Sequence, residues 1–516
     1  MCKNRPEMLI ILDGFGLSSQ TLYNAIYHAD TPNLDRWMRT YPAASLFASG
    51  AYVGLVNGYI GNSEVGHMTI GSGRVVLQPV ARVHESIADK SFFKNKALLE
   101  GLKKIKKCSG RLHIMGILSD AGVHGHIEHL YAFLRAAKEQ GIKNVYVHLF
   151  LDGRDVAPRT AANYLSKLTD FMVKQEFGVI GSIHGRFYAM DRDKNWDRIE
   201  KSYNVLIGKK RGYDDLACPG HTRGCKCWKL ILEKSYQEGI SDEFIKPLQI
   251  DPESSIKDGD GIIFYNFRPD RARQLVSSFV DKEFEHFPVK NIDLSCFVTP
   301  IRYSSELPTD FMFKKEPVLN TLTNVLCKNG KSVFAIAETE KYAHVTYFFN
   351  GGREAKLNNE KQVLIQSIKT KDYAKHPKMS AEIITSTVLD SLASDPHDFY
   401  LINYANADMV GHSGNFEATV RAIECLDVEL KKLFDVLVEK MGGTMYVTSD
   451  HGNAEQMLDK DSGQPYTAHT TNKVPFIMIK KGLENSGIKI ELDQLADIAP
   501  FILKQMGLKV PRQMRS

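Results

Sequence analysis

A serine in a glycine-rich turn is the first residue of this sequence whose surroundings indicate chemistry. Ser63 lies in the stretch 61–66, which begins and ends with glycine, and no catalytic base is recognisable beside it. A serine in such a turn is usually only a turn residue. Elsewhere in the chain, however, Asp13, Asp408 and Asp450 each follow an apolar run. Because a metal ion can activate a hydroxyl without a protein base, this combination indicates a metal-activated serine nucleophile.

Three histidines accompany these carboxylates at spacings that suit a metal site. Asp408 and His412 are four residues apart and face the same way on a helical turn. Asp450 and His451 are adjacent, and His469 precedes another apolar run. Such ligands without a thiolate suit Mn²⁺ or Zn²⁺ better than Mg²⁺, which prefers oxygen. Any one pair could be a turn cap and a loop histidine, but the whole set predicts a metal centre.

Arginines follow strand-like runs in the middle of the chain, at Arg154, Arg186, Arg192, Arg268 and Arg271. The planar guanidinium binds a carboxylate or a phosphate through two hydrogen bonds at once. Arg268 and Arg271 are three residues apart and would face one ligand if a helix begins there. We therefore predict a site for a small anion, with an exposed basic surface as the alternative.

These residues are positioned by apolar runs of strand length that alternate with longer helical patterns, which predicts an α/β fold. The clearest helical patterns span 416–441 and 494–506, and each is followed by glycine. The predicted strands are 8–12, 112–118, 145–151, 262–265, 399–402, 445–447 and 475–479. Because ligands bind at the carboxyl ends of parallel strands, the polar residues that follow these runs are expected to share a site.

The metal-type residues lie on both sides of the arginine-rich segment, which predicts a discontinuous outer domain with an inserted one. We place the outer, metal and nucleophile domain at 1–77 and 313–516, and the inserted, substrate-binding domain at 80–310. The segments 74–80 and 300–312 are the predicted hinge linkers between them.

Composition excludes several other classes of protein. Of 516 residues, 43% are hydrophobic and 25% charged, as in globular proteins. The net charge of +5 does not favour a nucleic-acid partner. No signal-peptide pattern and no apolar run of membrane length is present. The eight cysteines are scattered apart from one cluster, so we expect reduced thiols in the cytoplasm. We also expect a monomer without membrane contact.

Several motifs together resemble those of the cofactor-independent phosphoglycerate mutases, a family of the alkaline phosphatase superfamily of metalloenzymes. The similar stretches are 13–16, 61–67, 339–344, 406–412, 448–455 and 469–472, in the same order along nearly the whole chain. The resemblance implies an α/β protein with a discontinuous, alkaline-phosphatase-like metal-binding domain and an inserted α/β substrate-binding domain. It also implies an isomerase of glycolysis and gluconeogenesis that interconverts 3-phosphoglycerate and 2-phosphoglycerate through a phosphoserine. No 2,3-bisphosphoglycerate would be needed.

The resemblance also assigns the metal ligands. It implies two Mn²⁺ ions, for which Zn²⁺, Co²⁺ or Mg²⁺ could substitute, and a nucleophilic Ser63. One ion would be held by Asp408, His412 and His469, and the other by Asp13, Ser63, Asp450 and His451. Lys341 is similar to the family lysine that neutralises charge beside the nucleophile.

The substrate-binding residues implied by the resemblance are His124, Arg154, Asp155, Arg186, Arg192, Arg268, Arg271 and Lys341. Asp155 would act as acid or base for the glycerate hydroxyls. The sequence departs from the family pattern at Ala121 and Gly125, where the family has glycine and serine, and both changes are small.

Other interpretations stay open at this point. A phosphatase or a phosphopentomutase would use a similar metal shell, although phosphopentomutases typically use threonine as the nucleophile. A metal-binding protein without activity and a basic interaction scaffold are further alternatives. His124, His126 and His129 have metal-ligand spacings, and the stretch 218–227 has three cysteines and a histidine that could bind zinc.

Overall fold

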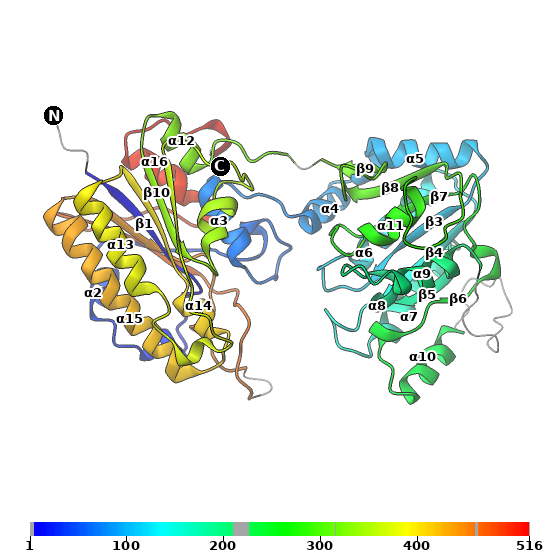
Figure 1. The fold of residues 1–516 in the computed structure, drawn as a ribbon, viewed down its shortest axis with the longest axis horizontal. Helices are drawn as coiled ribbons and strands as arrows, with labels where there is room; N and C mark the ends of the chain where they lie inside the picture. The colour runs from blue at the N-terminus through cyan, green and yellow to red at the C-terminus, as the bar shows by residue number, and fades with distance from the viewer. Residues whose placement is uncertain (1–4, 210–226, 315, 460–462, 515–516) are drawn as a thin grey trace. The chain divides into compact units, whose positions relative to one another are not determined.

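A computed structural model of the chain describes residues 5–209, 227–314, 316–459 and 463–514. They form two compact units: unit 1 comprises Met1–Gln78 with Pro317–Ser516, and unit 2 comprises Pro79–Glu316. Each contains a sheet with helices on both faces (Figure 1). The predicted α/β fold is thus confirmed. Of the cysteine-rich stretch 218–227, all but Cys227 lies outside the described residues.

One predicted linker belongs to a sheet. The segment 300–312 contains the end of β8 (Cys296–Ile301) and most of β9 (Asp310–Phe313), which pair in parallel within unit 2. Tyr303, between these strands, is 1% exposed and donates its hydroxyl to the Phe264 carbonyl at 3.1 Å. The buried tyrosine therefore ties this segment to unit 2, and the chain passes into unit 1 only after Glu316.

The described residues of unit 1 form a sheet in the order β11-β10-β12-β1-β13-β14-β2. Its strands are β1 (Glu7–Leu12), β2 (Ala43–Leu46), β10 (Val333–Glu338), β11 (Glu360–Ile365), β12 (Phe399–Tyr404), β13 (Thr444–Thr448) and β14 (Val474–Lys480). β2 and β14 are antiparallel to their neighbours, and the other pairs are parallel. β1 lies between β12 and β13, and its residues Met8–Leu12 are fully buried, as expected of a parallel strand covered on both faces.

Helices cover both faces of this sheet (Figure 1). On one face lie α2 (Pro32–Thr40), α13 (Ala381–Ser394) and α15 (Phe416–Phe434), and on the other α3 (Ser63–Ser72), α12 (Leu322–Lys328) and α16 (Ile498–Gln505). The short α1 (Ala25–His28) and α14 (Asn406–Gly411) complete the unit. The helix predicted at 416–441 is continued beyond α15 by a π-helix, η7 (Asp435–Lys440).

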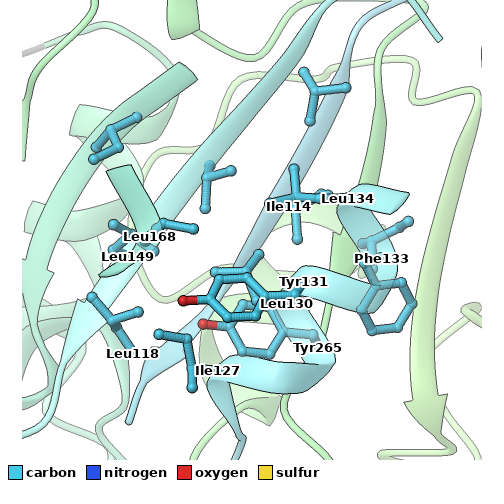
Figure 2. Packing of buried hydrophobic residues seen from close by; sticks show 14 of the residues in the cluster. Ile114, Leu118, Ile127, Leu130, Tyr131, Phe133, Leu134, Leu149, Leu168 and Tyr265 are labelled. Atoms are coloured by element: carbon cyan, nitrogen blue, oxygen red, sulfur yellow. The ribbon is translucent and has the colours of Figure 1, made fainter. Parts of the chain in front are cut away.

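The sheet of unit 2 has the order β6-β5-β4-β3-β7-β8-β9 in the described residues. Besides β8 and β9 its strands are β3 (Leu112–Leu118), β4 (Val145–Leu151), β5 (Val179–Gly185), β6 (Leu248–Gln249) and β7 (Gly261–Phe264). Its helices are α4 (Pro79–Ala88), α5 (Lys96–Lys107), α6 (Ile127–Glu139), α7 (Ala161–Gln175), α8 (Arg186–Ala189), α9 (Trp196–Leu206), α10 (Trp228–Gln237) and α11 (Arg273–Val280). Leu130 and Phe133 of α6 pack with Ile114 of β3 and Leu149 of β4 on one face (Figure 2).

The opposite face of this sheet buries several histidines. His113, His148 and His184 are at most 1% exposed, and burial lowers the pKa of each, to about 3 for His184. They are therefore neutral in folded unit 2 at neutral pH. In the unfolded chain the same histidines take up protons below pH ~6.5.

Unit 2 is therefore expected to lose stability on mild acidification. Below pH ~6.5 the unfolded state binds more protons than the folded state, so each buried histidine lowers the free energy of unfolding by about 1.4 kcal/mol per pH unit. Urea unfolding of the Trp37→Phe variant reports on unit 2 through Trp196 and Trp228. Its midpoint should fall steeply from pH ~7.5 to pH ~5.5. The Trp196→Phe/Trp228→Phe variant, which reports on unit 1 through Trp37, is the control, and chelator is present throughout so that loss of bound metal does not contribute. An equal fall there would contradict the prediction.

Candidate functional site

The carboxyl ends of the parallel strands of unit 1 meet at one edge of the sheet and supply most of the candidate residues. Asp13 directly follows β1, Lys341 lies three residues after β10, and Asp450 lies two residues after β13. Asp408 lies in α14, just after β12. Residues from distant parts of the chain are thus placed together by the sheet, as predicted.

Ser63 is the first residue of α3, which Asn62 caps by accepting a hydrogen bond from Val65 N. Its side chain is nearly buried, at 7% exposure. Ser63 Oγ lies 2.7 Å from Lys341 Nζ, 3.0 Å from His451 Nε2 and 3.2 Å from Asp13 Oδ1. The hydroxyl therefore points into a cluster of charged groups rather than into the turn.

Asp408, His412 and His469 form one group whose ligand atoms lie within 4.8 Å of one another. Asp408 Oδ1 is 3.2 Å from His412 Nε2 and 3.1 Å from His469 Nε2. The Nδ1 atoms lie 2.7 Å from the Thr467 carbonyl and 2.9 Å from the Gly61 carbonyl, respectively. Since a carbonyl only accepts, each Nδ1 carries a proton and the neutral ring presents a bare Nε2. The Nε2 lone pairs of His412 and His469 and the Asp408 carboxylate thus lie close together, and this set of ligands can bind a divalent cation.

Asp13, Asp450 and His451 form a second such group, and all of them are fully buried. His451 Nδ1 lies 3.3 Å from the Gly452 carbonyl, which again leaves Nε2 as the bare atom, 3.5 Å from Asp13 Oδ1 and from Asp450 Oδ2. Asp450 Oδ2 lies 3.1 Å from the buried His67 Nδ1 but has no hydrogen bond of good geometry from any described residue. This carboxylate oxygen and the bare imidazole nitrogen of His451 also fit a cation.

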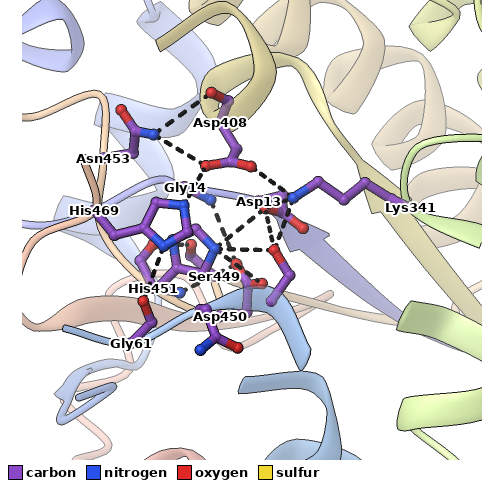
Figure 3. A network of polar contacts seen from close by, with 12 residues as sticks. Asp13, Gly14, Gly61, Lys341, Asp408, Ser449, Asp450, His451, Asn453 and His469 are labelled. Carbon is purple, nitrogen blue, oxygen red and sulfur yellow. Dashed lines mark hydrogen bonds and ion pairs between the residues drawn. The ribbon is translucent and has the colours of Figure 1, made fainter. Parts of the chain in front are cut away.

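Lys341 joins the two groups (Figure 3). Its Nζ lies 2.6 Å from Asp13 Oδ1 and 2.6 Å from Asp408 Oδ2. Burial opposes the charge of the ammonium, yet the pKa of Lys341 is raised because Asp13, Asp408 and Asp450 surround it. Burial and the charge of Asp450 raise the pKa of Asp13. One ammonium does not balance three buried carboxylates, so the site has excess negative charge that divalent cations would offset.

A layer of hydrogen bonds behind these residues was not predicted from the sequence. Asn403 Nδ2 donates to Asp13 Oδ2 at 2.8 Å, and Asn453 Nδ2 donates to Asp408 Oδ1 at 3.0 Å. The buried Glu455 accepts from Asn453 N at 2.8 Å and from Gly16 N at 3.1 Å. The position of Asn403 in a strand just before this edge was a usable signal, whereas the role of Glu455 depends on tertiary contacts.

In unit 2, the predicted substrate residues gather around Asp152, Asp155 and Asp270. Arg186 Nη1 lies 2.5 Å from both Asp152 Oδ1 and Asp155 Oδ2, and the Arg186 side chain is 2% exposed. His124 Nε2 lies 3.9 Å from Asp155 Oδ2, and its Nδ1 lies 3.7 Å from Asp270 Oδ1. The structure thus brings His124, Asp155 and Arg186 together and adds Asp152 and Asp270, which sequence reasoning had not selected.

The remaining arginines lie around the same cluster. Arg192 and Arg268 pair with Asp270 at 3.1 and 3.2 Å. Burial and the charges of Arg186, Arg192 and Arg154 lower the pKa of Arg271. The Arg154 side chain is 57% exposed, and its Nη1 lies 3.4 Å from Glu243 Oε1. Mutual repulsion among the guanidinium groups indicates a site suited to an anion.

A cluster of histidines and a cavity, both in unit 2, do not form candidate sites. His129 Nε2 lies 2.9 Å from His84 Nδ1, and His126 packs against both rings. In the described part of the chain, however, the groups with metal-ligand geometry are the two of unit 1. A cavity of about 1340 Å³ in unit 2, lined by Phe279, Phe284 and their neighbours, contains none of the predicted site residues.

A hydroxyl nucleophile that relies on cations instead of a protein base is characteristic of metal-dependent phosphoryl-transfer enzymes. Comparisons with known proteins narrow this class. Residues 83–305 match the family described as BPG-independent PGAM N-terminus. The chain is 46% identical over 515 residues to the 2,3-bisphosphoglycerate-independent phosphoglycerate mutase of Clostridium novyi (strain NT), covering 99% of this chain and 98% of that protein. The corresponding enzyme of Clostridium beijerinckii is 44% identical at the same coverage.

A solved structure agrees with these relatives. The phosphoglycerate mutase of Leishmania mexicana, determined at low cobalt concentration, matches with a TM-score of 0.66 and 29% identity, covering 99% of this chain and 97% of that chain. The chain belongs to the family of 2,3-bisphosphoglycerate-independent phosphoglycerate mutases. It is an isomerase of the alkaline phosphatase superfamily that interconverts 3-phosphoglycerate and 2-phosphoglycerate in glycolysis. The family depends on divalent metal and not on bisphosphoglycerate, as predicted.

No helix of the described ranges combines the length and apolar character needed to cross a membrane.

Proposed function

We propose that this chain carries out the interconversion by transferring the phosphoryl group of 3-phosphoglycerate to Ser63 and returning it to the other hydroxyl of the same glycerate. The observation that carries the proposal is the position of Ser63 Oγ, 2.7 Å from a lysine that also contacts Asp13 and Asp408. Attack by Ser63 as an alkoxide forms the new O–P bond while the bond to the glycerate oxygen breaks, and the alkoxide is regenerated when the phosphoryl group returns to the glycerate. Asp155 gives a proton to the leaving oxygen and takes one from the hydroxyl that attacks next.

The charge of the transferred group is offset within unit 1. Two divalent ions, Mn²⁺ in this proposal with Zn²⁺, Co²⁺ or Mg²⁺ as substitutes, would lower the pKa of the Ser63 hydroxyl and neutralise phosphate charge. The residues that would hold them are Asp408, His412 and His469 for one, and Asp13, Ser63, Asp450 and His451 for the other. Lys341 stabilises the equatorial phosphate oxygens through its ammonium, which stands beside the nucleophile.

Unit 2 is proposed to bind the glycerate. A carboxylate suits the guanidinium groups of Arg186, Arg192, Arg268 and Arg271, whose excess positive charge supports this role. His124 has a pKa lowered to about 3 by burial and by Arg186, so it is neutral and can hydrogen-bond a hydroxyl. Arg154 completes the proposed set in unit 2, and Lys341 of unit 1 is the substrate-binding residue proposed for the phosphate.

The protein is further proposed to act as a cytoplasmic monomer without nucleic-acid or membrane partners. The small net charge of +5 supports the absence of a nucleic-acid surface. The free thiols of Cys108, Cys296, Cys327 and Cys425 are consistent with a reducing compartment.

A coupled assay with enolase tests the proposed function directly. Without 2,3-bisphosphoglycerate, we expect full activity after dialysis against chelator and addition of Mn²⁺, and activity near background in chelator alone. Activity that persists in the chelated protein, or that requires bisphosphoglycerate, would contradict the proposal. Release of inorganic phosphate from 3-phosphoglycerate, measured in parallel, would instead favour a phosphatase.

Cation binding is expected to weaken on mild acidification. Asp408 raises the pKa of His412 and, against the effect of burial, that of His469. Protons and cations therefore compete for the same Nε2 atoms, and protons prevail at lower pH. Titration with Mn²⁺ should give an apparent affinity that falls by at least about tenfold from pH ~8 to pH ~6. An affinity that does not change with pH would exclude these histidines as ligands.

A further inference from the structure

Strands β4 and β5 pair with a one-residue irregularity near the middle. Val147 pairs with Ile180, but the next residue, His148, pairs with Ser182, so Gly181 has no pairing residue in β4. Such a β-bulge reverses which face of the sheet each following side chain occupies.

The two apolar residues that flank the bulge show this reversal. Ile180 and Ile183 are three residues apart, yet both belong to the same apolar cluster, whereas a regular strand places residues two apart on one face. Ser182 and His184, and after them Arg186, therefore lie on the opposite face. Without the bulge, Arg186 would be on the face that α6 and α7 cover.

The register after the bulge also selects the partner of Arg186. The pairs continue as Phe150 with His184 and Leu151 with Gly185. The next residues are Asp152 and Arg186, and these form the buried ion pair at 2.5 Å. Without the bulge, the residue opposite Asp152 would be Gly185. The position of the proposed substrate arginine thus depends on the extra residue at Gly181.

A chain of buried side-chain hydrogen bonds fastens the bulge together with the hydrogen bonds that Ile250 N and Ser254 Oγ donate to the Gly181 carbonyl. Ser182 Oγ lies 2.7 Å from both His148 Nδ1 and His184 Nε2. His148 Nε2 lies 2.9 Å from His113 Nδ1, and His113 Nε2 lies 3.1 Å from Asp260 Oδ2. Ser182, the three histidines and Asp260 are each at most 3% exposed. This chain of hydrogen bonds runs from Asp260 across β3, β4 and β5 and ends beside the bulge.

The direction of this chain follows from its charged end. Asp260 pairs with Arg111 at 2.6 Å, so it is ionised and accepts from His113 Nε2. Neutral His113 then accepts at Nδ1 from His148 Nε2, and His148 accepts at Nδ1 from the Ser182 hydroxyl. Ser182 Oγ in turn accepts from His184 Nε2. The Ser182 hydroxyl therefore both donates and accepts across the two strands.

We propose that Ser182 is a positioning residue for substrate binding: through the chain to Asp260 it fixes the bulge at Gly181 and thereby places Arg186 beside Asp152 and Asp155. The inference rests on the proposed function of Arg186. It assigns the network a role in the geometry of the substrate site, beyond its role in the core of unit 2.

Ser182→Ala should raise the KM for 3-phosphoglycerate about tenfold, the cost of one misplaced charge-assisted hydrogen bond, and lower kcat less than about threefold. Ser182→Thr keeps the hydroxyl and should restore most of the lost affinity. The matched control is Ser278→Ala in α11, which also removes a buried hydroxyl. This hydroxyl donates to the Leu275 carbonyl of the same helix at 2.7 Å. The control should keep the wild-type KM even if urea unfolding shows a similar loss of stability.

The Arg186→Ala variant shows whether a negative result for Ser182→Ala affects only the inference or also the proposed substrate role of Arg186. A raised KM for Arg186→Ala together with a wild-type KM for folded Ser182→Ala would overturn the inference and leave the proposed function intact. An unchanged KM for Arg186→Ala would overturn the substrate role of Arg186 and the inference with it. If Ser182→Ala does not fold, nitrogen NMR of the wild-type protein tests the inference by showing which ring nitrogen of each histidine carries the proton. Protons on Nε2 of His113, His148 and His184 support the chain, and a proton on any Nδ1 overturns it.

Discussion

Replacing Ser63 by alanine is expected to lower kcat by about 10⁴-fold or more, because no other described hydroxyl is placed to take over as the nucleophile. Ser63 Oγ lies 2.7 Å from Lys341 Nζ, so the positive charge that would stabilise its attack is already in place. Activity is measured with the enolase-coupled assay. The phosphoenzyme is trapped by acid quenching after mixing with 3-phosphoglycerate that carries labelled phosphate, and the variant should show no label.

Ser72→Ala is the matched control for this experiment. Ser72 lies in the same helix, is fully buried, and donates its hydroxyl to the Arg74 carbonyl at 2.8 Å. The control should retain both kcat and the labelled intermediate. If Ser63→Ala still turns over at a rate close to wild type, the phosphoserine route is wrong and the site serves another purpose, such as cation binding alone.

Replacing Lys341 by methionine is expected to affect both stability and turnover. The buried ammonium lies 2.6 Å from Asp13 and from Asp408, and its loss leaves these carboxylates without a compensating charge. In metal-free protein the free energy of unfolding should fall by about 3–5 kcal/mol. The kcat of the metal-loaded variant should fall about 10²–10³-fold, because the ammonium no longer stabilises the phosphate oxygens.

The stability loss should be smaller in Mn²⁺-loaded protein, since bound cations would offset the same carboxylates. Urea unfolding of chelated and loaded protein measures this difference. Lys331→Met is the control: Lys331 pairs with Asp398 at 3.1 Å but is 25% exposed, and an ion pair of this kind contributes about 1 kcal/mol or less. A Lys341→Met variant no less stable than this control, with unchanged kcat, would remove Lys341 from the site.

Most interior strands of both sheets could be predicted from the sequence, because burial on both faces produces continuous apolar runs, but β5, β8 and β10 were not among the predicted strands. β1, β3 and β4 are where these runs indicated. The short edge strands β2, β6 and β9 were not predicted, since a strand of two to four residues with one covered face has little pattern. The bulge at Gly181 was also missed, because it depends on which histidine and serine meet across two strands.

Only some residues of the candidate site could be predicted from the sequence, as was the case for the strands. Asp13 and Asp450 could be found because they follow strands of one parallel sheet, which brings them together. Lys341 was selected only through the family resemblance, since a lysine after a strand is ordinarily exposed. Asn403 and Glu455 act through hydrogen bonds between segments far apart in the chain, and no local pattern encodes such contacts.

The central place of β1 in the sheet of unit 1 has a consequence for how the enzyme is made. β1 lies between β12 and β13, so the ribosome must add about 390 residues after Leu12 before its first neighbour is complete. At about 5–20 residues per second this takes roughly 20–80 s. Unit 2 has all its strands between Pro79 and Glu316 and can fold during that interval. We expect the apolar segment Met8–Leu12 to remain unpaired during this time and to be bound by chaperones on the nascent chain.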